Sequence, residues 1–300
     1  MAKPLTLSRL IESDELASHL GDPGLRIVQV CSAERFNEGH PPQAIHATPQ
    51  ALCLGIPPLV GMTPSLAQIK QLIEAINLTE TSWVVALDDE GGGWAGRLLW
   101  TLDMIGFNRW SLLNGGLWAW SGSGHGLTQP RTNELQGAIP NPATPNPATT
   151  EPEKTELWPY LWADNPPAVD ANTLKAHLDD PDWVVWDARS AAEYTGEHQT
   201  ALRNGHIPGA RHYEWTRAMD KAQDLRLRDL EQIRTELAAL GITSDKTIVT
   251  HCQSHHRSGF TWALGRVLGF DKILAYPGSW GEWGNSPDLP IVTGNNPRAD

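Results

Sequence analysis

The residues best suited to chemistry lie between His251 and Gly259, where the chain reads His-Cys-Gln-Ser-His-His-Arg-Ser-Gly. Residues 248–251 are β-branched and apolar, which is typical of a buried strand, and apolar residues recur at helical spacing from Ser258 onward. Cys252 is therefore expected to open a tight loop between a strand and a helix. Backbone N–H groups in such a loop, together with the helix dipole, favour negative charge. They can lower the pKa of a thiol from about 8.5 to roughly 3.5–7.5, so the sequence predicts a thiolate nucleophile at Cys252.

The spacing from Cys252 to Arg257 indicates what this nucleophile attacks. Four residues separate the two, and a loop this short has room for a sulfur chain but little room for a whole phosphate group. Phosphatases with the same general arrangement use one more residue. An arginine near the start of a helix opposes the helix dipole, so Arg257 is expected to have a specific partner, either an acidic side chain or the substrate anion. Ser258 is interpreted as a cap of the helix.

The other cysteines and the loop histidines have simpler interpretations. Cys31 follows a strand and Cys53 lies in an apolar stretch, so both are interpreted as buried structural residues. A nest of amides turns its backbone inward and spreads its side chains outward, so no metal site is expected at the loop. His255 and His256 are expected to shape the loop rim or to titrate near neutrality, and the alternative is a solvated loop surface.

The loop resembles that of the rhodanese family when it is taken together with three segments upstream. These segments are Asp187-Ala188-Arg189, Glu193-Tyr194-Thr195-Gly196 and Gly205-His206-Ile207-Pro208-Gly209-Ala210. In particular, the loop looks like that of two-domain bacterial thiosulfate:cyanide sulfurtransferases, and the resemblance covers nearly the whole chain. It implies an α/β fold of two tandem rhodanese-like domains, each a parallel β-sheet flanked by helices on both faces.

The resemblance also implies a function, the transfer of sulfane sulfur from thiosulfate to an acceptor such as cyanide or a thiol. The sulfur would travel as a persulfide on Cys252, and no other cofactor is expected. The loop residues expected to stabilise the persulfide are Gln253, Ser254, His255, His256, Arg257 and Ser258.

Residues outside the loop are less clearly assigned. Asp187 and Arg189 follow a strand end and form either a substrate contact or a structural ion pair. Trp215 either lines the cleft or packs in the core, and His206 is expected to be structural, in a turn. Several sulfurtransferases have a second arginine four residues after the Asp-x-Arg motif, but here that position is Glu193, so no cationic clamp is assigned to it.

The two halves of the chain repeat the same order of elements. Strand 83–87 and helix 65–76 of the first half correspond to strand 248–251 and helix 230–240 of the second, which predicts a parallel sheet in each half. The domains are expected at residues 1–125 and 166–300, joined by an extended Pro/Thr/Asn-rich linker over 126–165.

Alignment of the two halves places Asp88 opposite Cys252 and Trp94 near Arg257. A carboxylate cannot carry sulfur, so the first domain is expected to be inactive. The resemblance agrees, since two-domain rhodaneses have an inactive first domain that helps to wall the active cleft.

Composition narrows the class of protein. The net charge of -12 opposes binding to a phosphate backbone, so nucleic acid is not an expected partner. Three widely spaced cysteines do not form a disulfide framework and favour a reducing compartment. The start of the chain does not resemble a signal peptide, and no apolar run approaches the ~20 residues of a membrane span. The chain is therefore expected to be soluble, cytoplasmic and without a membrane partner. A cleft between unlike halves needs no second copy, so a monomer is expected.

Three alternatives remain open on the sequence alone. The nearest is 3-mercaptopyruvate as the sulfur donor, although enzymes for that donor usually have small residues after the cysteine. A tandem module that binds or carries sulfur without turnover is the second. A phosphatase is the third, and the short loop argues against it.

Overall fold

The first unit of the fold is built on one parallel sheet. In the computed structural model, which describes residues 5–57, 59–129 and 162–298, the strand order is β1-β5-β4-β2-β3. Every pairing between these strands is parallel, and each residue of the central strand β4 is buried, as expected for a sheet covered on both faces. The elements of this unit are β1 (Leu10–Ile11), α1 (Ser13–Ser18), β2 (Leu25–Val30), α2 (Ala33–Glu38), β3 (Ile45–Ala47), η1 (Pro49–Leu52), α3 (Leu66–Ala75), β4 (Trp83–Leu87), α4 (Gly93–Met104), β5 (Trp110–Leu113) and α5 (Gly116–Gly122).

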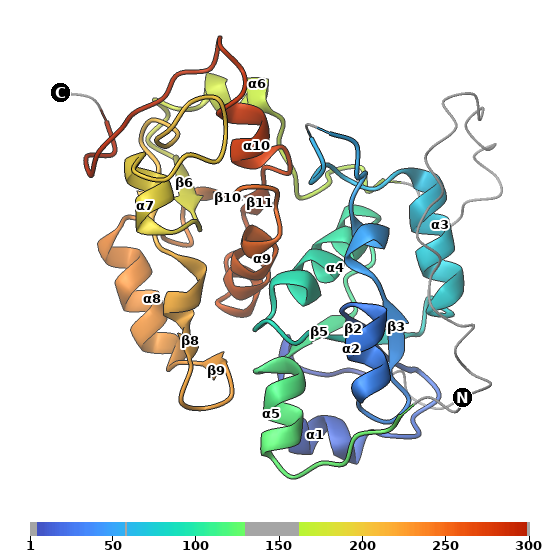
Figure 1. Cartoon of the computed structure of the whole chain (residues 1–300). Helices are drawn as coiled ribbons and strands as arrows, with labels where there is room; N and C mark the ends of the chain where they lie inside the picture. The colour runs from blue at the N-terminus through green and yellow to red at the C-terminus, as the bar shows by residue number, and fades with distance from the viewer. Residues whose placement is uncertain (1–4, 58, 130–161, 299–300) are drawn as a thin grey trace. The chain divides into compact units, whose positions relative to one another are not determined.

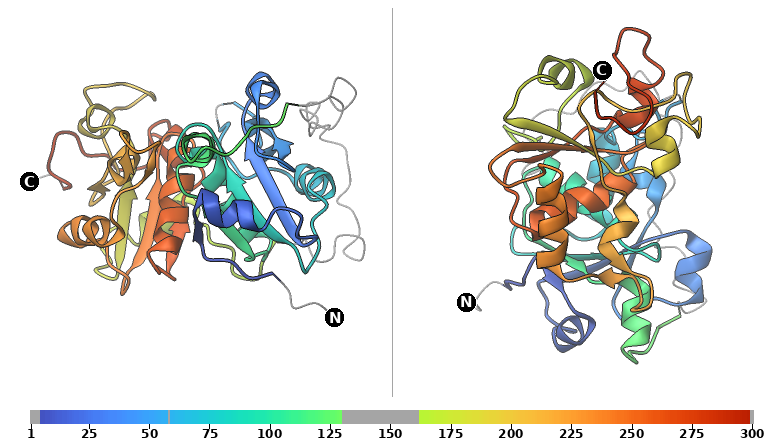
Figure 2. Two further views of the ribbon diagram at one scale, coloured as in Figure 1. Left: turned by 90° about the horizontal axis from the view of Figure 1, so that it is seen from below. Right: turned by 90° about the vertical axis from the view of Figure 1, so that its left-hand side faces the viewer.

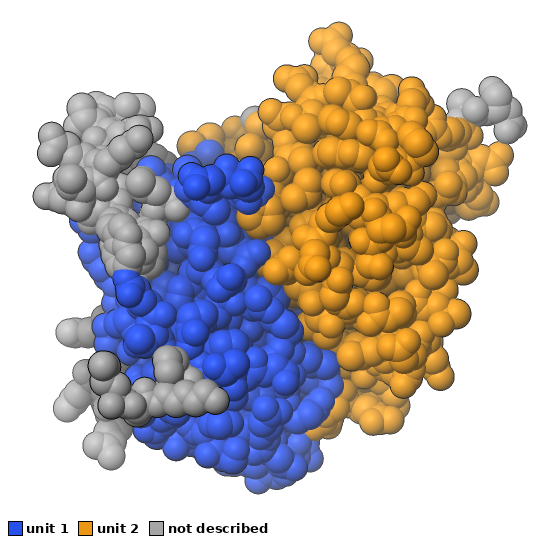
Figure 3. Space-filling model, turned by 180° about the vertical axis from the view of Figure 1, so that it is seen from behind, with its two compact units in different colours: residues 1–54, 63–166 blue, residues 55–62, 167–300 orange. Residues whose placement is uncertain are grey.

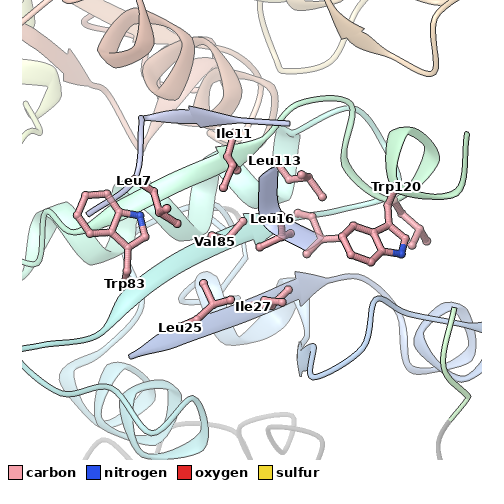
Figure 4. Packing of buried hydrophobic residues seen from close by; sticks show 11 residues of the cluster. Leu7, Ile11, Leu16, Leu25, Ile27, Trp83, Val85, Leu113 and Trp120 are labelled. Carbon is pink, nitrogen blue, oxygen red and sulfur yellow. The ribbon is translucent and has the colours of Figure 1, made fainter. Parts of the chain in front are cut away.

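Alternate residues of these strands form the core that Figure 4 shows. Ile27 of β2 and Val85 of β4 point to one face of the sheet, where Leu16 of α1 and Trp120 of α5 pack against them. Strand residues of opposite parity face the other way, and α4 packs along β4, β2 and β5. Helices therefore cover both faces of the first sheet.

The second unit repeats this plan with the order β11-β10-β6-β7, again entirely parallel. A parallel bridge from Ala168 to Ala275 extends the sheet beyond β11, in the place that β1 takes beside β5 in the first unit. The elements are α6 (Ala171–Ala176), β6 (Trp183–Asp187), α7 (Ala191–Thr195), β7 (Arg211–His212), η3 (Trp215–Ala218), β8 (Met219–Asp220), β9 (Arg226–Leu227), α8 (Leu230–Ala239), β10 (Thr247–His251), α9 (Arg257–Val267), β11 (Ile273–Ala275) and α10 (Ser279–Trp283).

The two faces of the second sheet carry different helices. Val185 and Val249 are register partners and share one core with Leu174 of α6, Tyr194 of α7 and Trp283 of α10. On the opposite face α9 packs along β10 and β11, as Figures 1 and 2 show. In an open parallel sheet, ligands bind at the carboxyl ends of the strands. The carboxyl end of β10 is therefore the expected place for a site.

The observed architecture is the tandem α/β fold that the repeat and the resemblance predict. Some local boundaries differ. Helix α4 begins at Gly93, five residues after Asp88, and α9 begins at Arg257, one residue earlier than the pattern indicates. Ser258 therefore lies within the helix and does not cap it, since the cap position is His256, which makes no side-chain capping bond.

Contacts group the chain into two compact units, residues 1–54 with 63–166, and residues 55–62 with 167–300. Figure 3 colours the units accordingly. The short segment 55–62 thus belongs to the second unit, although it lies within the first half of the sequence. The exact domain limits, 1–125 and 166–300, stay predictions, and most of the linker predicted over 126–165 lies outside the described residues.

Candidate active site

Cys252 lies directly after β10 and five residues before the start of α9, at the carboxyl end of the sheet. Its side chain is 1% exposed, and the Ser258 hydroxyl lies 3.4 Å from Sγ. Burial opposes ionisation, but the Arg257 guanidinium and hydrogen bonds from Ser258 and from the backbone N–H of Ser254 outweigh it, so the pKa of the Cys252 thiol is lowered. The sulfur is buried, yet the groups around it favour the thiolate.

The start of α10 holds the backbone of the loop. The Cys252 carbonyl accepts a hydrogen bond from the Trp280 N–H, and the Gln253 carbonyl accepts one from the Gly281 N–H, both at 2.9 Å. The Cys252 N–H donates to the Ser279 hydroxyl at 3.3 Å. Both loop carbonyls are therefore engaged by N–H groups of α10.

The Gln253 side chain forms a second anchor and does not reach the sulfur. Its Oε1 accepts from the Thr200 hydroxyl at 2.7 Å, and its Nε2 donates to the Thr200 carbonyl at 3.0 Å. Gln253 is thus a support of the loop. Thr200 and Ser279 are two parts of the site that the sequence pattern did not reveal, because nothing in the local spacing links them to Cys252.

Arg257 has an acidic partner, Glu193 of α7. Two hydrogen bonds join the guanidinium to the carboxylate, from Nη1 at 2.6 Å and from Nη2 at 2.8 Å. Burial acts against the Glu193 carboxylate, but the bonds from Arg257 outweigh it and lower its pKa to about 2. The same pair raises the pKa of Arg257 despite its own burial. Glu193, at the position where several sulfurtransferases have a second arginine, therefore holds the loop arginine, Arg257.

Asp187 and Arg189 form a fully buried ion pair, with Nη2 and Oδ2 2.6 Å apart. Arg189 also donates to the Gly205 carbonyl, and its guanidinium lies 4.4 Å from the centre of the Trp280 ring. Burial alone would raise the pKa of Asp187, but Arg189 outweighs it and the pKa falls. The two residues thus form an ion pair, and a contact with substrate stays a prediction.

His251, the last residue of β10, lies beside the buried Asp187–Arg189 ion pair. Its Nε2 lies 3.4 Å from Asp187 Oδ2, and its Nδ1 lies 3.2 Å from the Cys252 carbonyl oxygen. Burial lowers the pKa of His251 to about 4, so the imidazole is neutral at physiological pH. His206, expected to be structural, is also buried between the Tyr194 and Asn296 carbonyls.

The two loop histidines differ from each other. His255 is fully buried in a left-handed conformation with φ of 56°, and its Nδ1 lies 2.7 Å from the Ser258 hydroxyl. The alternative of a solvated loop surface is therefore wrong for His255. The His256 ring lies 5.8 Å from that of Trp215, which in turn meets the Phe260 ring at 5.9 Å. Trp215 thus packs between the loop and α9.

A segment from the first half of the chain covers the other side of the loop. The segment comprises residues 55–62, of which 55–57 and 59–62 are described, and in it the Gly55 N–H donates to the Val60 carbonyl at 3.1 Å. Gly61 packs so closely on the backbone of Ser254 that a β-carbon at this position would collide with the Ser254 carbonyl. Only a glycine allows this approach. This covering segment was not evident from the sequence.

In the first unit, the loop after β4 corresponds to the Cys252 loop, and the Asp88 side chain fills its nest of backbone N–H groups. Asp88 follows β4 and is fully buried, and its carboxylate accepts hydrogen bonds from the N–H groups of Glu90, Gly92 and Ala95 at 2.7–3.0 Å. An acidic side chain thus follows the central strand in each unit, a carboxyl group in the first and a thiol in the second. Burial raises the pKa of Cys31 to about 12, in keeping with a structural thiol.

Residues 5–57, 59–129 and 162–298 contain neither a cluster of metal ligands nor a membrane-spanning helix. In these ranges no three His, Cys, Asp or Glu side chains gather closely enough to hold a metal ion. The same ranges contain no helix with the length and apolar character needed to cross a bilayer.

Several known proteins are similar to this chain in sequence along nearly its whole length. The thiosulfate sulfurtransferases of Azotobacter vinelandii and Pseudomonas aeruginosa are 41% and 40% identical to the chain, over 95% of its length and 97% of theirs. The sulfur carrier protein TtuD of Thermus thermophilus is 29% identical over 95% of the chain and 96% of its own length.

Solved structures agree on the fold. YnjE superposes with a TM-score of 0.79 at 18% identity, covering 96% of this chain and 69% of that one. The anaerobic ergothioneine biosynthesis enzyme of Chlorobium limicola superposes with a TM-score of 0.76 at 22% identity, covering 99% and 72%. The model of the rhodanese-like domain matches twice, over residues 12–123 and 170–286. The chain therefore belongs to the rhodanese family and carries two copies of its domain.

Proposed function

We propose that this protein is a thiosulfate sulfurtransferase in which Cys252 carries the transferred sulfur as a persulfide. The observation that carries the proposal is the setting of Sγ, where Arg257, the Ser258 hydroxyl and two backbone N–H groups together lower the pKa of a fully buried thiol. The thiosulfate sulfurtransferases of Azotobacter vinelandii and Pseudomonas aeruginosa, similar along nearly their whole length, support the same reaction.

The reaction divides into two displacements. The Cys252 thiolate attacks the outer sulfur of thiosulfate, and the new S–S bond forms as the S–S bond of thiosulfate breaks. Sulfite leaves with the electron pair of the broken bond, and the persulfide keeps one negative charge. Cyanide or a thiolate acceptor then attacks the outer persulfide sulfur, and the Cys252 thiolate is regenerated.

The loop supplies the electrostatic part of catalysis. The terminal persulfide sulfur carries a charge comparable to that of the thiolate, and amides fixed by the fold stabilise such a charge without the reorganisation that water would need. Both terminal nitrogens of Arg257 are engaged by Glu193, so Arg257 contributes its charge from a fixed position. The sulfur itself is left to the backbone N–H groups and the Ser258 hydroxyl.

The physiological donor and acceptor belong to the same proposal. We infer thiosulfate as the donor and a small thiophile, cyanide or a thiol, as the acceptor. A carrier role, in which the persulfide forms and passes only to a protein thiol, is the second candidate, and the 29% identical relative from Thermus thermophilus is named a sulfur carrier protein.

The decisive experiment is intact mass spectrometry of the whole chain before and after thiosulfate, and again after cyanide. The wild type should gain the mass of one sulfur and lose it with release of thiocyanate. Cys252→Ser should do neither, while the matched control Cys53→Ser, in the first unit, should behave as wild type. Thiocyanate formation by Cys252→Ala at the normal rate would end the assignment. A persulfide that forms but does not turn over with cyanide or small thiols would favour the carrier.

A further inference from the structure

The hydroxyl of Ser258 lies between two groups that can each hold a proton. Its Oγ is 3.4 Å from Cys252 Sγ and 2.7 Å from His255 Nδ1. All three side chains are buried, with Cys252 1% exposed and the other two fully enclosed. A proton that leaves the thiol thus meets the hydroxyl before it meets bulk water.

A serine hydroxyl has one hydrogen and two acceptor lone pairs, so it can donate in only one of these two contacts, and two of the possible arrangements matter here. In the first, the thiol donates to Oγ and the hydroxyl donates to Nδ1, which must then be unprotonated. In the second, Nδ1–H donates to Oγ and the hydroxyl donates to the thiolate. The two arrangements therefore differ in the proton on Cys252 and in the proton on Nδ1 of His255.

We propose that Cys252, Ser258 and His255 form a proton relay in which His255 accepts, through Ser258, the proton that Cys252 gives up. One S–H bond breaks, the serine O–H bond is exchanged, and one N–H bond forms at Nδ1. The products are a thiolate and an imidazolium, so the net charge of the buried group does not change. The role deepens the proposed function and rests on it, since it prepares the same sulfur for attack.

The backbone of the loop brings His255 to this position. His255 adopts a left-handed conformation, with φ of 56°, which a residue with a β-carbon reaches only at a cost of about 1 kcal/mol. Asparagine and glycine adopt this conformation more readily. The histidine is thus held in an unfavourable conformation that directs its ring to the serine beneath the sulfur.

Other charged and titratable groups of the second unit surround the relay. Arg257 with its partner Glu193 lies on the α7 side, and His251 lies with the Asp187–Arg189 pair at the strand ends. The His256 ring packs beside the Trp215 ring. The covering segment 55–62, Gly-Ile-Pro-Pro-Leu-Val-Gly-Met, has no titratable side chain. Any test must therefore separate His255 from His251 and His256.

The test is a pH titration of the Cys252 thiolate in the sulfur-free protein, followed by ultraviolet absorbance with Cys252→Ser as the blank. The wild type should show two steps, one as the thiolate–imidazolium pair forms and one as the imidazolium loses its proton. In His255→Asn, the amide can still donate to Oγ and fits the left-handed backbone. Its titration should keep an acidic thiol but collapse to one step.

Two more variants complete the series, and His198→Asn, at an exposed histidine of the same unit, serves as the matched control. Ser258→Ala breaks both contacts, so the thiolate should form only at higher pH and persulfide formation at pH 7 should slow by about tenfold or more. His255→Ala should resemble Ser258→Ala, and His255→Asn should partly restore the rate. A wild-type, two-step titration in His255→Asn, or an unchanged one in Ser258→Ala, would overturn the relay.

The relay and the proposed function fail in different ways. If the relay is wrong, the variants still gain the mass of one sulfur from thiosulfate, and His255→Asn titrates in the same two steps as the wild type. If the proposed function is wrong, the wild type gains no sulfur, whatever the titration shows. Melting temperatures of all variants exclude loss of the fold as the cause of either result.

Discussion

The carboxylate of Glu193 and the guanidinium of Arg257 meet through two parallel hydrogen bonds, although 64 positions separate them in the chain. Glu193 also accepts from the backbone and side chain of Ser190, in the capping box of α7. One carboxylate thus fixes both the start of α7 and the cation that faces Cys252. The stability of the fold and the charge at the sulfur are therefore coupled through Glu193.

We expect Glu193→Gln to change how stability depends on pH. The pKa of Glu193 is about 2 in the folded protein, below its ordinary value, so the carboxylate stabilises the fold above about pH 4.5. This contribution, roughly 2 kcal/mol for a pair with some solvent access, disappears as the pH falls toward 2. Urea unfolding from pH 7 to pH 3 should show the wild type and Glu193→Gln converging. Parallel curves would contradict the role of the pair.

Arg257→Lys should slow persulfide formation without removing the positive charge. Lysine offers a point charge and cannot repeat the two-bond geometry with Glu193, so the cation is less firmly placed beside Sγ. We expect the rate with thiosulfate at pH 7 to fall by at least about tenfold, with a greater recovery at high pH than in the wild type. Stopped-flow fluorescence can follow the reaction. Arg266→Lys, on the same helix and in a weak pair 3.9 Å from Asp271, is the matched control.

Asp88→Asn tests the filled nest of the first unit. Three backbone N–H groups point at this carboxylate, and the variant turns one acceptor oxygen into a donor, so the free energy of unfolding should fall by about 2 kcal/mol. Sulfur transfer per folded molecule should stay within about twofold, because Asp88 takes no part in the displacement. Circular dichroism in urea and a thiocyanate assay measure the two effects. Glu80→Gln, at an exposed carboxylate, is the control. If it lowers the free energy of unfolding as much as Asp88→Asn does, the nest gives Asp88 no special role in stability.

Gly61→Ala should disturb the loop from outside. The added methyl group meets the Ser254 carbonyl, and the N–H of Ser254 is one of the donors to Sγ. A displacement of this donor should slow persulfide formation by roughly 10- to 100-fold, while Cys252 remains present and the fold persists. Gly126→Ala, where a β-carbon would meet nothing, should react at the wild-type rate. An equal rate in both variants would show that the covering segment does not hold the loop.

Local patterns were enough to determine the element that carries the chemistry. A buried apolar strand, a short polar loop and a helix place Cys252 at a carboxyl end of the sheet, because these periodicities depend only on neighbouring residues. The same reasoning aligned the halves and predicted the repeated parallel sheet. It also put Asp88 in the place of the nucleophile, where the structure finds its carboxylate in a nest of amides.

Only the tertiary structure decided which distant groups meet the loop. The parallel register that sets Asp187 opposite His251 buries their side chains together, and it brings α7, with Glu193, within reach of Arg257. The Ser258 hydroxyl lies against the sulfur, although the pattern suggested a helix cap, and His255 is buried, which excludes the alternative of a solvated loop surface. Such contacts depend on sheet pairing and helix packing across many residues, and no local spacing encodes them.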